Sequence, residues 1–66
     1  MDEKQANAVV EALGGSAFEG DGGAWLVGIK RDDGSVVVVS DEAVIEYESE
    51  QAYEENRAPR KSIMLA

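Results

Sequence analysis

The first residues of the chain carry apolar side chains at the period of an α-helix. Within residues 2–13 (DEKQANAVVEAL), they recur at i, i+3, i+4 and i+7, on one helical face: Ala6, Val9, Val10 and Leu13. Asp2 stands at the N-cap and Gln5 three residues later, which is the spacing of a capping box. The two glycines at 14–15 supply the left-handed residue that commonly ends a helix. We therefore expect a helix over residues 2–13.

Beyond these glycines the pattern changes to short strands separated by turns. Residues 24–31 (AWLVGIKR) and 35–40 (SVVVVS) are rich in the aromatic and β-branched side chains that favour strands. Between them, the sequence DDG at 32–34 predicts a hairpin. Residues 16–19 (SAFE) predict a further short strand, and GDGG at 20–23 is a turn because glycine and aspartate tolerate positive φ.

Residues 43–49 (AVIEYES) alternate between apolar and polar side chains, which predicts another main strand. Ile45 and Tyr47 share one face of this strand. Glu46 and Glu48 lie on the other face, where we expect water to surround both carboxylates.

A second, shorter helix is predicted over residues 49–57 (SEQAYEENR), with Ser49 as its N-cap. The alternative is one continuous helix over residues 41–57, which the apolar spacing and two adjacent β-branched residues disfavour. Pro59 ends any helix. The tail at 58–66 then forms an edge strand or docks on the core, and the pattern leaves both outcomes open.

These elements together predict a single small α+β domain over residues 1–66. Its N-terminal helix packs on a three- to four-stranded antiparallel meander, followed by a short second helix and a C-terminal tail or edge strand. A domain of this size buries only about 60% of the surface of its unfolded chain. We therefore expect a free energy of unfolding of about 3–5 kcal/mol.

The four valines at 36–39 raise the main structural question. A continuous apolar run indicates a strand that is buried on both faces, because successive side chains point to opposite sides. The N-terminal helix covers only one side of the sheet. The other side must be covered by helix 49–57, by the tail, by a second copy of the protein or by a different partner. The open edges of a small sheet also allow strand pairing in a homodimer.

The valine run leaves the register of the hairpin open. A two-residue turn at 33–34 pairs Ile29 with Val38, whereas a three-residue loop at 32–34 pairs Ile29 with Val37. Both pairings place an apolar side chain opposite Ile29, so the pattern does not choose between them.

Composition narrows the list of functions. The 66 residues include 14 acidic and 6 basic side chains, a formal net charge of −8, and neither cysteine nor histidine. Disulfides, thiolate metal sites and the commonest general base are therefore absent. The negative charge argues against direct binding to nucleic acid or to an anionic membrane. No apolar run reaches the roughly 18 residues of a membrane span, and we expect a cytoplasmic protein of bacterial type.

The glycine-rich and acidic loops match no motif that would carry chemistry. The glycines at 14–23 follow a helix and precede a strand, which is the reverse of a phosphate-binding loop. Counted from Asp32, the sixth and twelfth positions are Val37 and Ala43, where a calcium-binding EF-hand requires glycine and glutamate. The serines have no histidine to activate them. We expect no cofactor, no metal and no catalysis.

The segment at 41–55 contains seven acidic and no basic residues. It predicts either a solvated surface, partly neutralised by Arg57, Arg60 and Lys61, or a surface that docks a basic protein. The candidate partner-binding residues are Glu46, Glu48, Glu50, Tyr53, Glu54 and Glu55. The leading hypothesis is a non-catalytic protein–protein interaction module that can form a homodimer. The alternative is an acidic inhibitor or antitoxin-like regulator that mimics nucleic acid and binds a basic partner.

Overall fold

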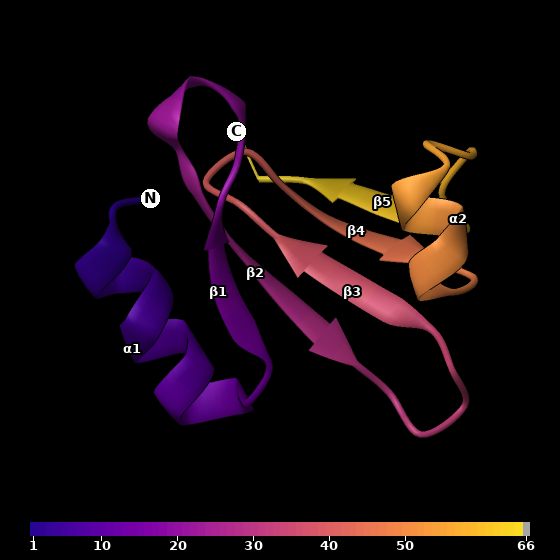
Figure 1. Ribbon diagram of the computed structural model, residues 1–66, viewed down its shortest axis with the longest axis horizontal. Helices are drawn as coiled ribbons and strands as arrows, with labels where there is room; N and C mark the ends of the chain where they lie inside the picture. Colours follow the sequence, from indigo (N-terminus) through magenta and orange to yellow (C-terminus); the bar gives the residue numbers. More distant parts are fainter. Residues whose placement is uncertain (66) are drawn as a thin grey trace.

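The protein is a five-stranded antiparallel sheet with two helices (Figure 1). The computed structural model describes residues 1–65, and Ala66 at the end of the predicted tail and the side chain of Asp21 lie outside this description. In chain order the elements are α1 (Glu3–Leu13), β1 (Ser16–Glu19), the 3₁₀ turn η1 (Asp21–Gly23), β2 (Trp25–Lys30), β3 (Val36–Val39), β4 (Ala43–Tyr47), α2 (Glu50–Glu54) and β5 (Lys61–Met64). The predicted α+β class is confirmed.

The strands follow one another across the sheet in the order β1-β2-β3-β4-β5, so each pairs with its neighbours in the chain. The segment predicted as a strand over 43–49 forms β4, and the continuous helix over 41–57 does not form. The tail becomes β5, which pairs with β4 and extends the predicted meander to five strands. Within residues 1–65 neither helix has the length and apolar character needed to cross a lipid bilayer.

Helix α1 begins and ends where its capping residues predict. The Gln5 backbone N–H donates to Asp2 Oδ1 over 2.8 Å, and the Asp2 backbone N–H donates to Gln5 Oε1 over 3.0 Å. Gly14 ends the helix with a φ of +84°, a value that side-chain-bearing residues rarely adopt. The helix packs against β1 and β2, where Ala6 has no exposed surface.

The hairpin between β2 and β3 has a three-residue loop, which fixes the register that the sequence left open. Ile29 lies opposite Val37. The Arg31 N–H donates to the Ser35 carbonyl over 2.9 Å, and the Gly34 N–H donates to the Arg31 carbonyl over 3.0 Å. Gly34 has a φ of +91°, so glycine at the third loop position allows this turn.

Val36, Val37 and Val38 are buried within the chain itself, and α2 covers one of the two faces on which they lie. Val36 and Val38 are 6% and 7% exposed, and their face of the sheet also carries Phe18 and Tyr47, by strand register. Helix α2 covers this face, because the ring of Tyr53 contacts the rings of both Phe18 and Tyr47.

The opposite face of the sheet packs against α1. Val27 points to this side and has no exposed surface, and Val37 on the neighbouring strand is 8% exposed. The cover that the valine run requires therefore comes from the chain's own second helix. Neither the tail nor a second copy is needed to complete the core.

Candidate protein-interaction site

The six residues predicted to bind a partner lie on two different sides of the sheet. Glu46 pairs with Val37, so it shares the face of α1. Helix α2 carries Glu50, Tyr53 and Glu54. It lies on the opposite face, because Tyr53 contacts Phe18 and Tyr47, which the strand register places on that face. One continuous partner surface therefore cannot use all six side chains.

Glu46 is held inside an ion-pair cluster, which corrects the expectation that water surrounds it. Its Oε1 accepts from Arg31 Nη1 over 2.7 Å and its Oε2 accepts from Arg60 Nε over 2.6 Å, and its side chain is 11% exposed. The hydrogen bond from Arg60, together with the charges of both guanidinium groups, holds the pKa of this carboxyl below its ordinary value of 4.5. Glu46 thus ties the hairpin and the start of the tail to β4.

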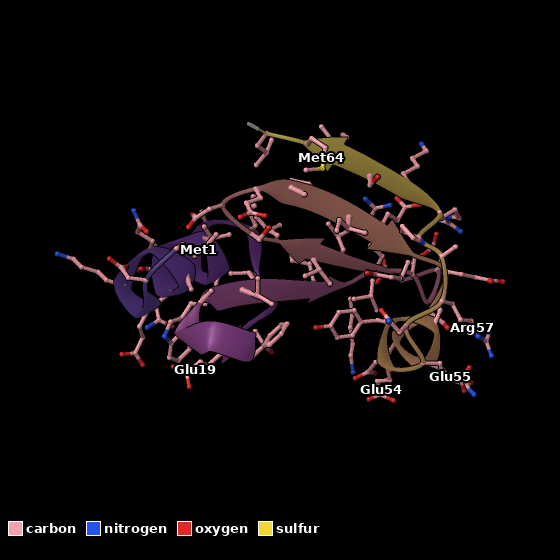
Figure 2. All side chains as sticks on the ribbon, turned by 90° about the horizontal axis from the view of Figure 1, so that it is seen from above. Met1, Glu19, Glu54, Glu55, Arg57 and Met64 are labelled. Carbon is pink, nitrogen blue, oxygen red and sulfur yellow. The ribbon has the colours of Figure 1, made fainter. Side chains whose placement is uncertain are left out.

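The other acidic side chains of the set are exposed, and Figure 2 shows Glu54 and Glu55 at α2. Glu50 pairs with Lys30 over 2.8 Å, and Glu55 pairs with Arg57 over 2.5 Å. The hydrogen bond with Glu50 raises the pKa of Lys30 above its ordinary value. Glu48 and Glu54 are exposed. Two of these four carboxylates therefore form ion pairs, and only the pair of Glu55 with Arg57 uses one of the basic residues at 57–61 that the sequence predicted to neutralise the segment.

Tyr53 serves the core and is not an exposed aromatic anchor. Its ring lies 6.3 Å from the ring of Phe18 and 5.2 Å from the ring of Tyr47, with interplanar angles of 68° and 71°. These are edge-to-face pairs, a favoured arrangement of aromatic rings. Ser49 positions the ring, because its Oγ accepts the Ala52 N–H over 3.1 Å and so caps α2.

A shallow groove of about 490 Å³ lies between α2 and the sheet. Phe18, Val36 and Val38 line it, together with Gly28, where an added Cβ would lie 3.3 Å from Phe18 Cε1. The glycine thus gives room to the aromatic ring, as a glycine within a strand commonly does. In the described part of the chain, acidic side chains do not gather in any group that could hold a metal ion.

Most of the large apolar side chains that are exposed among the described residues lie on β5 or directly after it. Ile63, Met64 and Leu65 are 61%, 67% and 56% exposed, and every residue of β5 is exposed. Figure 2 shows β5 at the outer border of the sheet, with Met64 on it. Leu13 at the end of α1 is the other large apolar side chain exposed among the described residues, at 65%.

Among residues 1–65, β5 is the last strand of the sheet and so forms an open edge. The opposite edge strand, β1, has α1 beside it (Figure 1). An edge of unpaired backbone groups lined with apolar side chains is a template for pairing with another strand. This geometry makes β5 the strongest candidate for a binding surface.

The sequence predicted that residues 58–66 form an edge strand or dock on the core, and that an open sheet edge allows pairing with a second copy. The signal that identifies Ile63, Met64 and Leu65 is three consecutive large apolar residues at the described edge of the sheet. Their exposure depends on how α2 packs, which the pattern of residues did not show.

Comparison of the chain with protein-family models, with curated proteins and with solved structures gave no match.

Proposed function

We propose that this protein is a non-catalytic protein–protein interaction module, cytoplasmic and of bacterial type, that docks through the open edge of β5. The observation that carries the proposal is the exposure of Ile63, Met64 and Leu65 on an unpaired edge strand. Natural edge strands usually carry charges or proline that prevent association, whereas β5 carries a single charge, Lys61 at its start, and is apolar at Ile63 and Met64. Binding of another strand would hydrogen-bond the edge and partly cover Ile63 and Leu65 on one face of the sheet and Met64 on the other.

The absence of catalysis is part of the same proposal. The chain has no histidine or cysteine, and the lysine that lines the groove beside α2, Lys30, is paired to Glu50. General acid–base work by a carboxyl needs a desolvated group whose pKa is raised. The pKa values of Glu46 and Asp33 are instead lowered, by hydrogen bonds from Arg60 and Ser35 respectively. Their environment favours the charged, structural form of each carboxylate.

The alternative is an acidic docking surface for a basic partner, including a regulator that mimics nucleic acid. The net charge of −8 and the exposed carboxylates of Glu48 and Glu54 favour it. The ion pairs at Glu50 and Glu55 reduce the charge that such a surface would offer. Capture of a basic partner must weaken as salt rises, whereas docking through an apolar strand edge does not depend on salt in this way.

The test of the proposed function compares two substitutions of exposed apolar residues. Ile63→Lys places a charge on β5, and Leu13→Lys places the same charge on an equally exposed residue of α1. We expect wild type and Leu13→Lys to retain the same partner, a second copy or another protein, on an immobilised column, and Ile63→Lys to lose it. Equal retention by all three proteins contradicts docking through β5, and loss in about 0.5 M salt supports the acidic-surface alternative.

A further inference from the structure

We propose that β5 pairs with β5 of a second copy, antiparallel about a two-fold axis at Ile63, so that two sheets become one continuous sheet. The inference rests on the proposed function and names the partner. It follows from which backbone groups of β5 remain unpaired, from the side chains that this register brings together, and from the charges at its ends.

The backbone of β5 presents one consistent set of outward groups. The Leu65 N–H donates to the Glu42 carbonyl over 2.8 Å, and Ile63 pairs with Val44 in the same ladder. In an antiparallel pair the bonding direction alternates from residue to residue. The N–H and C=O groups of Ser62 and Met64 therefore point away from β4 and are free to bond to another strand.

A two-fold axis at Ile63 uses all of these outward groups. It places Ser62 of each copy opposite the partner's Met64, so each pair exchanges N–H to C=O hydrogen bonds in both directions. A two-fold axis at Ser62 would instead place Met64 opposite Arg60, which precedes the strand. The register centred on Ile63 thus satisfies more of the edge than its neighbour does.

The same register brings matching side chains together. Ile63 and the partner's Ile63 form a non-hydrogen-bonded pair, in which side chains approach most closely, with Cα atoms about 4.5 Å apart. Lys61 lies opposite the partner's Leu65, so its methylene groups can cover that side chain. The Leu65 N–H is hydrogen-bonded to the Glu42 carbonyl. The Lys61 ammonium group of each copy therefore lies beside the partner's turn at 41–42, which is acidic.

Charge also favours self-pairing through β5 over self-pairing through β1. β1 ends with Glu19 and has α1 packed against it. Self-pairing through β1 would therefore bring carboxylates of two copies close together, although each copy already has a net charge of −8. β5 begins with Lys61 and contains no acidic residue. Two copies still repel each other at long range, so salt should strengthen or leave unchanged an association through β5.

The register predicts an experiment in which two defects cancel. In Ile63→Lys and in Ile63→Glu, like charges meet at the two-fold axis, and each variant should self-associate at least about tenfold more weakly than wild type. In an equimolar mixture the opposite charges meet and a heterodimer should form at about 0.05 M salt. Leu13→Lys is the matched control and should dimerise as wild type does. Ile63 is 61% exposed, so circular dichroism should show all variants folded.

Analytical ultracentrifugation over roughly a hundredfold range of concentration reads each outcome. Dimers of wild type and Leu13→Lys, monomers of each Ile63 variant alone, and dimers in the mixture support the inference. A wild type that stays monomeric at every concentration overturns it, while the column test above still decides the proposed function. If Ile63→Lys and Ile63→Glu each dimerise alone, or if their mixture forms no dimer, the pairing at Ile63 is overturned. Self-association of the wild type would still stand in that case.

Discussion

Tyr53→Ala is the substitution that most strongly tests the cover of the second face of the sheet. The ring contacts Phe18 and Tyr47, and it is part of what keeps Val36 and Val38 at 6% and 7% exposure. Removal of a buried aromatic ring costs about 3–5 kcal/mol. Tyr53 is half-buried, so about half of that cost applies, and the loss of two edge-to-face contacts adds about 1 kcal/mol. We expect the variant to lose about 3 kcal/mol, most of the stability of a domain this small.

Urea denaturation followed by the fluorescence of the single tryptophan, Trp25, measures this loss. Glu54→Ala is the matched control, because Glu54 follows Tyr53 in α2 but is exposed, and it should change the free energy of unfolding by less than about 0.5 kcal/mol. An equal midpoint for Tyr53→Ala and Glu54→Ala would refute the role of α2 as the second cover.

Three further substitutions test the details of the fold. Gly15→Ala should lower the free energy of unfolding, measured by urea denaturation, by about 1–3 kcal/mol more than Gly14→Ala does. Both glycines have positive φ, but only at Gly15 would the added Cβ meet backbone, 2.4 Å from the Gly28 oxygen. Equal losses for the two variants contradict this close approach. Asp2→Ala should lower the thermal midpoint through loss of about 1 kcal/mol of capping, and an unchanged midpoint contradicts the capping box. The lowered pKa of Glu46 stabilises the folded state above pH 4.5, and this contribution is lost as pH falls through the lower folded pKa. The stability deficit of Glu46→Gln, measured by urea denaturation, should therefore be present at neutral pH and shrink below pH 4.5, and a deficit independent of pH contradicts the ion pairs.

Local patterns predicted the elements that depend on local chemistry. The capping box at Asp2 and Gln5 and the glycine at position 14 fixed both ends of α1, because these residues act within one turn of the helix. The N-cap at Ser49 and the alternation that placed Ile45 and Tyr47 on one face were confirmed for the same reason.

Features that depend on the meeting of distant segments were not predictable from the pattern. Glu46 was expected to face water, but Arg31 and Arg60 reach it from positions 15 and 14 residues away. The register of the valine hairpin depended on the conformation of Gly34, since the run is apolar in either pairing. The exposed edge of β5 became a candidate site only once α2 had taken the role of second cover.

Amide hydrogen exchange at β5, followed by NMR at low and high protein concentration, tests the central claim most directly. The amides of Ile63 and Leu65 face β4 and should be protected at both concentrations. Those of Ser62 and Met64 face outward, and they should exchange rapidly in the dilute monomer and become protected in the concentrated dimer. Rapid exchange of Ser62 and Met64 at every concentration, or protection of both in the dilute monomer, would contradict the account.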